Sequence, residues 1–361
     1  YIMKFRNIFL FIGSIFIGVM AMEFGIRIIF KDWDVFSSHR FLRTMNVSGF
    51  GSLLMGVPGF DGVFEQNDGD FRVTIKINKS GYREIEPVSE ADGRIWFVGD
   101  SFSFGWGVDS LDRFSDRIGR LLKRPVYNLA SPAADVCDYQ AQIANMPRQL
   151  VPAGIVLGLT IENDLANYDC QRGRGPSESD PELKGRFQLP MSSLKHFFMK
   201  ESALYNIFVV NLKKSPFLVN LLRRLGIIAT PHAKIFDAAL VDRLIINKTV
   251  QEVLFLNSML PPETPLIVLI IPSRFDLRDG LHSEFQVRFD VINELEKHGI
   301  LVIDPSLEFK KVGFNKIHFV HDGHWSLLGH KIAADVLVSR CGSFGTKCFP
   351  FRSWNYKSKR K

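Results

Sequence analysis

Two common patterns are missing from this chain of 361 residues. Its 4 cysteines include no Cys-x-x-Cys pair, which argues against a structural zinc site. No segment repeats at a fixed period, which argues against a solenoid or a propeller. Cys341 and Cys348 are close enough in sequence for a small disulfide loop, which would fit an oxidising compartment. Four free, partly buried thiols account for the cysteines equally well.

Charge is missing from the run Ile8–Met22 near the N-terminus. This run is shorter than the roughly 20 residues that span a bilayer. Apolar residues resume beyond Glu23, so the pattern predicts an anchor helix that reaches about residue 30. A cleaved signal peptide is the alternative, but no Ala-x-Ala site follows the run, which favours an uncleaved signal-anchor.

The basic residues bear on orientation and on partners. Lys4 and Arg6 precede the apolar run, and the positive-inside rule then places the remaining chain on the extracytoplasmic, periplasmic side. Arg27 and Lys31 at the far end weaken this orientation. The net charge of +7 suits anionic surfaces such as lipid headgroups or acidic glycans, although scattered solvated side chains also explain it. We expect a membrane contact through the anchor and no nucleic-acid partner.

Five short apolar runs beyond residue 92 have the length and composition of buried parallel strands. Helical patterns lie between them, such as Leu111–Leu122, which carries its charges on one face, and Phe285–His298. Strands that alternate with helices predict an α/β fold of three layers, a doubly wound parallel sheet of the flavodoxin-like kind between helices. The five runs are Arg94–Val98, Pro125–Leu129, Gly154–Thr160, Pro265–Ile271 and Ile300–Ile303.

These patterns divide the chain into an anchor, a lead-in region with short strands, a main domain and a basic tail. Within the lead-in, Phe71–Asn78 alternates polar and apolar residues and predicts a half-exposed strand. A long excursion at 170–262 interrupts the main domain and becomes helical and apolar. We interpret it first as helices that cover the sheet; a cap over the site and a membrane-facing patch are the alternatives. The four parts are 1–31, 32–92, 93–345 and 346–361.

Polar side chains gather where the predicted strands end, and ligands of parallel sheets bind at the carboxyl ends of strands. Gly99-Asp100-Ser101 follows the first strand, and Glu162-Asn163-Asp164 follows the third. Asp322 and His324 lie beyond the fifth. A serine hydroxyl needs a neighbouring base to become a nucleophile, and that base needs a third group to orient it. Ser101, His324 and Asp322 supply these three parts.

Acyl transfer also needs donors where the oxyanion of the tetrahedral intermediate develops. The sequence offers the N–H of Ser101, a backbone N–H near Ala133 and the side-chain amide of Asn163. These three form the predicted oxyanion hole.

Each of these residues also has a simpler interpretation. Gly-Asp-Ser is often only a turn, Asn163 could cap a helix, and His324 could be a surface histidine. His321, Asp322 and His324 could also bind a metal ion, but no second ligand cluster accompanies them. The ordered combination of Ser, Asn and Asp-x-His is more specific than any one of them.

The chain resembles the SGNH (GDSL-like) hydrolase family in four blocks that lie within residues 93–340. The segment Ile77–Arg83 and the anchor are similar to membrane-anchored bacterial members, which accompany surface-polysaccharide pathways. The four blocks are Val98–Phe102, Asn128–Ala133, Glu162–Asp164 and Asp322–Trp325.

The resemblance implies a three-layer α/β/α fold with Ser101 as the nucleophile and His324 as the base. It places the oxyanion hole at Ser101, Ala133 and Asn163. No metal or organic cofactor is required for this chemistry.

The sequence departs from the family pattern at two points. Ala133 stands where the second block usually has glycine, and Asp322-x-His324 is one residue shorter than the common Asp-x-x-His. The shorter form, followed by Trp325, is similar to the acyltransferases of alginate O-acetylation. The α/β-hydrolase family fits less well, because Ser103 stands where its Gly-x-Ser-x-Gly motif needs glycine.

We therefore expect an anchored serine esterase or O-acyltransferase that acts on acyl esters, acetyl above all, of a surface or extracellular polysaccharide. Its partners would be an acylated carbohydrate or another ester and proteins of a polysaccharide pathway. A lipid esterase or thioesterase, and a catalytically silent glycan-binding assembly protein, are the alternatives.

Overall fold

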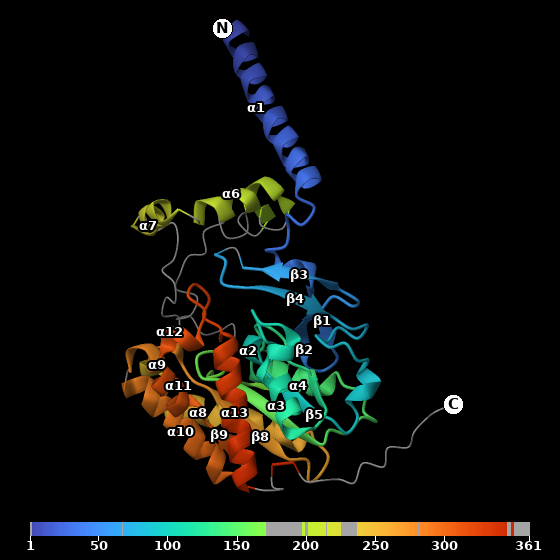
Figure 1. The fold of residues 1–361 in the computed structure, drawn as a ribbon, viewed down its shortest axis with the longest axis vertical. Coiled ribbons are helices and arrows are strands. Elements are labelled where there is room, and N and C mark those ends of the chain that lie inside the picture. The colour runs from blue at the N-terminus through green and yellow to red at the C-terminus, as the bar shows by residue number, and fades with distance from the viewer. Residues whose placement is uncertain are drawn as a thin grey trace, which may run out of the picture. The chain divides into compact units, whose positions relative to one another are not determined.

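The computed structural model divides the chain into two compact units, each described here by itself (Figure 1). Unit 1 comprises 1–40, 63–72 and 182–230, and unit 2 comprises 41–62, 73–181 and 231–361. The structure describes residues 2–66, 68–170, 197–198, 201–213, 215–224, 237–280, 282–344 and 348–349.

A five-stranded parallel sheet forms the centre of unit 2. Each strand coincides with one of the five predicted apolar runs, and the residues of the three central strands are all buried. The chain adds β6 on one side of β5 and then crosses to add β7 on the other side, so the order reverses beside β5. Such a switch point leaves a crevice at the carboxyl ends of the strands. The sheet order is β6 (Val126–Asn128), β5 (Ile95–Val98), β7 (Gly154–Thr160), β8 (Leu266–Ile271) and β9 (Leu301–Ile303).

Alternate side chains of the sheet enter two separate apolar cores. In β5, Trp96 and Val98 join one core, whereas Ile95 and Phe97 join the other. The first core also contains side chains of α4 (Val136–Ala144), α8 (Arg243–Ser258) and α10 (His282–Lys297). The second contains side chains of α3 (Phe114–Leu122), α11 (Ser306–Val312) and α13 (Leu327–Phe344). Helices thus cover both faces, and the predicted three-layer α/β/α sandwich is confirmed (Figure 1).

Short elements complete unit 2 and the lead-in. Strands β1 and β2 pair antiparallel, and β3 pairs with β4 in a second small sheet. The predicted half-exposed strand is confirmed by β4, whose side chains are alternately exposed and buried. The short elements are η1 (Ser38–Arg40), β1 (Leu42–Val47), β2 (Gly51–Gly56), β3 (Asp61–Glu65), β4 (Arg72–Lys76), η2 (Val88–Ala91), α2 (Ser101–Phe104), η3 (Ser110–Asp112), η5 (Ala238–Leu240), α9 (Arg274–Asp279) and α12 (Phe314–Ile317).

The lead-in packs against the turn that carries Ser101 through the buried side chain of Arg83. Its guanidinium donates to the carbonyl of Gly105 at 2.7 Å and to that of Val108 at 2.7 Å. These carbonyls lie in the loop that follows the one-turn helix α2, where the Gly105 carbonyl also accepts the Val108 N–H at 3.2 Å. Arg83 therefore braces the segment just beyond the predicted nucleophile.

Unit 1 contains the N-terminal helix α1 (Ile2–Ile29) together with α6 (Ala203–Lys213) and α7 (Pro216–Arg224). Within α1, the 20 residues Leu10–Ile29 are long and apolar enough to cross a membrane. This agrees with the predicted anchor helix. Of the helices in the excursion, α8 packs on the sheet of unit 2, whereas α6 and α7 belong to unit 1. Of the basic tail, the structure describes only residues 348 and 349.

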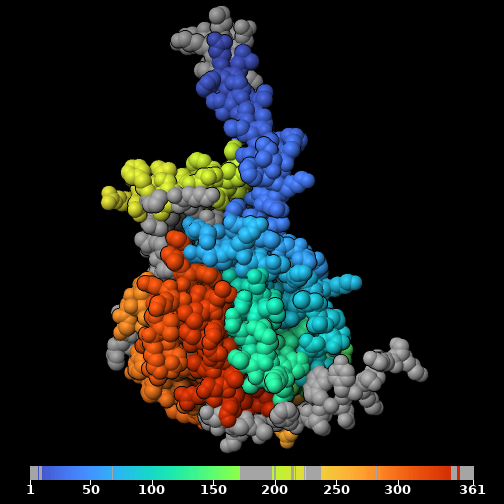
Figure 2. Space-filling view, in the orientation of Figure 1, coloured from blue at the N-terminus to red at the C-terminus, as the bar shows by residue number. Residues whose placement is uncertain are grey.

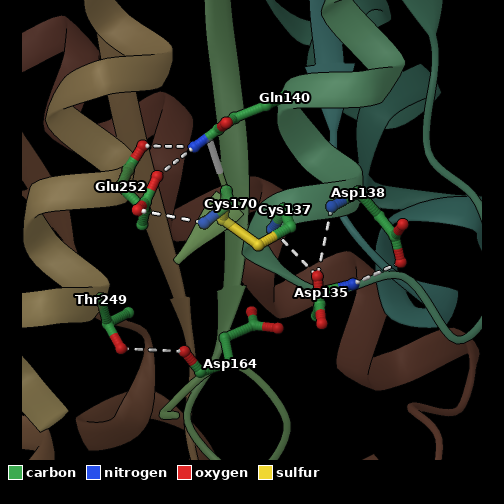
Figure 3. Close-up of a disulfide and its surroundings, with 8 residues drawn as sticks. All are labelled: Asp135, Cys137, Asp138, Gln140, Asp164, Cys170, Thr249 and Glu252. Atoms are coloured by element: carbon green, nitrogen blue, oxygen red, sulfur yellow. Dashed lines mark hydrogen bonds between the residues drawn. A yellow bond between two sulfur atoms is a disulfide. The ribbon is translucent and has the colours of Figure 1, made fainter. Parts of the chain in front are cut away.

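Two disulfides join the four cysteines, so the alternative of free thiols is wrong. The considered Cys341–Cys348 loop forms. The bond between Cys137 and Cys170 joins the first turn of α4 to the segment that follows β7 (Figure 3). Beside it, Gln140 of α4 donates to the Glu252 carboxylate of α8 at 2.8 Å. These contacts fix two of the loops at the carboxyl edge of the sheet.

The buried His330 packs against the second core, and it makes the stability of the folded protein depend on pH. Its Nδ1 accepts the Phe114 N–H at 3.3 Å, and the two rings stack at 5.8 Å. Burial, together with the positive charge of Arg117 nearby, lowers the pKa of His330 from 6.5 to about 3. The folded protein thus keeps this imidazole neutral where the unfolded chain protonates it.

We predict that His330→Gln reduces the acid sensitivity of the fold. Between pH 6.5 and about 3 the unfolded chain binds more protons at this site, so the free energy of unfolding falls as the pH falls. From pH 7 to pH 5 the wild type should lose about 2 kcal/mol more than the variant. Denaturant titrations of the full chain in detergent at both pH values measure this. Parallel losses in the two proteins would contradict the assignment.

Candidate active site

Ser101 lies at a tight turn between β5 and the one-turn helix α2. Gly99 has φ +153°, and a Cβ there would lie 2.3 Å from Ser103 Oγ, so only glycine fits. Asp100 caps the helix, since its carboxylate accepts the Phe102 N–H at 2.9 Å. The turn thus presents Ser101 as the first residue of α2, half-exposed at the carboxyl end of the strand.

The structure brings the predicted nucleophile, base and orienting acid together. Ser101 Oγ lies 2.7 Å from His324 Nε2, a contact between residues 223 positions apart. The opposite ring nitrogen, Nδ1, hydrogen-bonds Asp322 Oδ1. The same carboxylate oxygen accepts the His324 backbone N–H at 2.9 Å. The three side chains therefore form the hydrogen-bonded chain that a serine nucleophile requires.

Asp322 keeps its negative charge in this arrangement. Burial alone would raise its pKa, but the facing His324 and hydrogen bonds from His324 and Trp106 bring the pKa below the ordinary value for aspartate. The indole N–H of Trp106 can only donate, so this contact favours the charged form of the carboxylate. A charged Asp322 stabilises the imidazolium that forms when His324 accepts a proton.

The loop that carries Asp322 and His324 is anchored by the next residue, Trp325. Its ring is fully buried in the second core, 5.2 Å from the ring of Phe102. A short antiparallel bridge between His318 and Trp325 closes the loop. The buried Trp325 thus helps to position the half-buried His324 beside Ser101.

An ion pair packs against the same loop from a third segment. Arg274, the first residue of α9, donates through Nη2 to Glu162 at 2.7 Å and through Nε at 3.0 Å. A Cβ at Gly323 would lie 1.9 Å from Arg274 Nη1. The single residue between Asp322 and His324 must therefore be glycine, as long as Arg274 holds its place.

Asn163, which the sequence predicts as an oxyanion donor, is held by Asp100. Its side-chain amide donates to the Asp100 carboxylate at 3.1 Å. Burial raises the pKa of Asp100, against the hydrogen bonds from Phe102 N–H and Asn163. An amide nitrogen carries two hydrogens, so Asn163 retains one for a second acceptor. Asp100 thereby links the end of β5 to the loop after β7.

Ala133 has a left-handed backbone with φ +58°. A Cβ in this region costs about 1–2 kcal/mol, so glycine would adopt this backbone with less strain. The Ser131 N–H donates to the Gly99 carbonyl at 3.1 Å, so the loop of Ala133 lies against the turn of Ser101. Asn128 steadies the loop through its Oδ1, which accepts the Ala130 N–H at 2.9 Å.

Other residues near the site hold the scaffold. Asp164 is buried and accepts the Tyr139 hydroxyl at 2.8 Å. Burial raises its pKa well above the ordinary value. The alternative of a metal site at His321, Asp322 and His324 fits less well. Both ring nitrogens of His324 are engaged by Ser101 and Asp322, so neither is available to bind a metal ion.

Sequence reasoning missed Trp106, Arg274 and the role of Asp100. Glu162 was recognised only as part of a block, and its partner Arg274 lies 112 residues further along the chain. The one available signal was position, since Arg274 lies three residues beyond the end of the strand β8. Nothing in the sequence pairs Trp106 with Asp322.

This arrangement can deprotonate a serine hydroxyl and return the proton to a departing group. The donors of Ser101, Ala133 and Asn163 follow three adjacent strands, β5, β6 and β7. They reach the same edge of the sheet as the nucleophile. The geometry suits addition to a carbonyl and subsequent acyl transfer.

Comparisons with known proteins give a likeness of structure only. No protein-family model matches the chain, and no curated protein matches its sequence. A member of the lipolytic G-D-S-L family from Veillonella parvula is 14% identical, with a TM-score of 0.37 over 68% of this chain and 96% of that one. A lipase/acylhydrolase from Enterococcus faecalis is 12% identical, with a TM-score of 0.39 over 70% and 96%. A carbohydrate esterase is 14% identical, with a TM-score of 0.34 over 70% and 65%.

We predict that Ala133→Gly and Ala134→Gly change stability in opposite directions. Glycine relieves the left-handed backbone at Ala133, which outweighs its greater freedom in the unfolded chain, for a net gain of about 0.5 kcal/mol. The neighbouring Ala134 is buried without that strain, so its replacement should cost about 1 kcal/mol or more. Denaturant midpoints measure both. Equal losses would show that the backbone at Ala133 carries no strain.

We predict that Gly323→Ala lowers kcat by about 10²-fold, because the added methyl collides with Arg274 and displaces His324 from Ser101. Gly342→Ala in α13 is the matched control, since a Cβ there meets nothing within 4 Å. Adding Arg274→Ala to Gly323→Ala should restore part of kcat by removing the obstacle. Wild-type kcat in Gly323→Ala would contradict this account of the loop.

Proposed function

We propose that the chain is an SGNH-type serine esterase or O-acyltransferase that works through an acyl-enzyme on Ser101. One observation carries the proposal: Ser101 Oγ lies 2.7 Å from His324 Nε2 while Asp322 holds Nδ1. The four sequence blocks that resemble SGNH hydrolases support the same roles.

In the proposed reaction Ser101 attacks the ester carbonyl while His324 removes its proton. The oxyanion accepts hydrogen bonds from the N–H groups of Ser101 and Ala133 and from Asn163. His324 then gives its proton to the departing alcohol, which leaves the acyl group on Ser101. In an esterase, water then attacks the acyl group on Ser101, whereas in an acyltransferase a sugar hydroxyl attacks it. In either case His324 removes the proton of the attacking group, and the acyl group leaves Ser101.

The proposed substrate is an acyl ester, acetyl above all, of a surface or extracellular polysaccharide. The support is the Asp322-x-His324-Trp325 sequence, which is similar to the acyltransferases of alginate O-acetylation. A bulky polymeric acceptor is also compatible with a half-exposed Ser101. The anchor helix α1 would hold the site on the extracytoplasmic side, next to proteins of a polysaccharide pathway.

We predict that a fluorophosphonate probe labels the purified full chain at Ser101. Labelling should vanish in Ser101→Ala and fall by at least about 10³-fold in rate in His324→Ala, because the serine is then without its base. Ser103→Ala is the matched control: this serine is two residues away and fully buried, so its loss should leave the labelled position unchanged. Labelling that persists in Ser101→Ala would overturn the proposal.

The same preparation identifies the substrate class. Acetyl esters should turn over faster than long-chain esters, and an added oligosaccharide acceptor should divert the acyl group from water if the chain is a transferase. Faster turnover of long-chain esters would instead indicate a lipid esterase. Full biological function in a Ser101→Ala, His324→Ala double variant would indicate a silent assembly protein.

A further inference from the structure

Helices α6 and α7 of unit 1 form a second apolar feature beside the anchor. Figure 2 shows α6 (yellow-green) against the C-terminal half of α1 (blue), and the two helices are in contact. Both lie in the chain between Asn163 and Asp322, and neither contributes a residue to the proposed chemistry. Glu23 and Arg27 of α1 both contact the start of α6.

Glu23 of α1 holds the first turn of α6. Its Oε1 accepts the Ala203 N–H at 2.8 Å, and its Oε2 accepts the Leu204 N–H at 2.9 Å and the Ser202 hydroxyl at 2.9 Å. Arg27, one turn further along α1, donates to the same carboxylate at 2.8 Å. The first N–H groups of a helix have no intrahelical partners and favour a negative charge. Glu23 therefore fixes the N-terminus of α6 to α1.

This contact sets the depth of α6 along the apolar span. Glu23 lies 6 residues before Ile29, the end of the span Leu10–Ile29. At a rise of about 1.5 Å per residue, the contact is about 9 Å from that end. Amphipathic helices that lie in a membrane interface bury their apolar face about 5–10 Å. A carboxylate at this depth needs partners, and α6 and Arg27 supply them.

Large apolar side chains on α6 and α7 are exposed. Phe208 of α6 is 62% exposed and Phe217 of α7 is 75% exposed. On α7, Leu218 and Leu221 are exposed on the same side as Phe217. Successive residues of a helix are about 100° apart, so Asn220 points away from Leu218 by about 200°. Helix α7 thus presents one apolar and one polar side, the pattern of an interfacial helix.

The charged and aromatic residues near the end of α1 fit the same depth. The guanidinium of Arg27 lies 4.4 Å from the ring centre of Trp33. Tryptophan and basic side chains favour the headgroup level of a bilayer. Arg224 closes α7 with an exposed positive charge, which suits anionic headgroups.

We propose that α6 and α7 lie in the lipid–water interface beside α1, with their exposed apolar side chains in the leaflet at the C-terminal end of the anchor. The occupant of this apolar surface is the bilayer itself. A single spanning helix can rotate about its axis, whereas a spanning helix with an interfacial helix pair is attached at two points. Unit 1 is then held in one orientation to the membrane surface.

Labels on opposite sides of α7 test this proposal. All four native cysteines are in disulfides, so Leu218→Cys and Asn220→Cys each introduce one reactive thiol in the full chain. Each variant is labelled with the fluorophore NBD and reconstituted into vesicles of phosphatidylcholine and phosphatidylglycerol. A lipid with a doxyl quencher near the headgroup reports contact with the leaflet, and aqueous iodide reports contact with water. Fluorophosphonate labelling of Ser101 checks that each variant is folded.

The Leu218 label should lose about half of its emission or more in doxyl vesicles and be shielded from iodide, because it lies in the leaflet. The Asn220 label should show the reverse. Adding Glu23→Ala should release α6 and reduce the difference between the two labels. Equal quenching of both labels by iodide, with no effect of the doxyl lipid, would overturn the proposal. Shielding that appears only in native membranes would also overturn it, since another protein would then cover α7.

Discussion

The contact between Ser101 and His324 is the constraint on which the other features of the site depend. It joins residues 223 positions apart, at 2.7 Å, and neither residue lies on a long regular element. Ser101 is held because the strand β5 ends in a turn that only Gly99 permits. His324 is held because its neighbour Trp325 is buried in the same core as Phe102, the residue after Ser101. Ser101 and His324 are thus each adjacent in sequence to a residue buried in the same apolar core. This shared support keeps the distance between them fixed.

Polar contacts then join the ends of neighbouring strands. Asp100 after β5 accepts from Asn163 after β7, and Glu162 after β7 binds Arg274 after β8. The Cys137–Cys170 disulfide adds a covalent link between the first turn of α4 and the segment after β7. These contacts tie the loops of the site to one another, and preorganised oxyanion donors require such support.

Much of this fold could be predicted from the sequence because its signals are local. Each central strand is a short apolar run, and Ser101 and Asn163 follow such runs directly, so periodicity and position identified them. Ala133 was recognised as unusual, and its left-handed backbone gives the physical reason. The contacts of Arg274, Trp106 and Arg83 could not be predicted, because each pairs segments that only the folded sheet brings together. The contact of α6 with α1 is likewise made by side chains far apart in the sequence, with Glu23 and Arg27 of α1 bonded to the start of α6.

The central claim is that Ser101 carries the acyl group between donor and acceptor. Rapid quenching of the full chain with an acetyl ester, followed by mass spectrometry of the intact protein and its peptides, tests it most directly. The account predicts one acetyl group on the peptide that contains Ser101, formed within the first turnover and removed when acceptor is added. Turnover without any covalent acetyl group, or an acetyl group on another residue that Ser101→Ala leaves in place, would contradict the account.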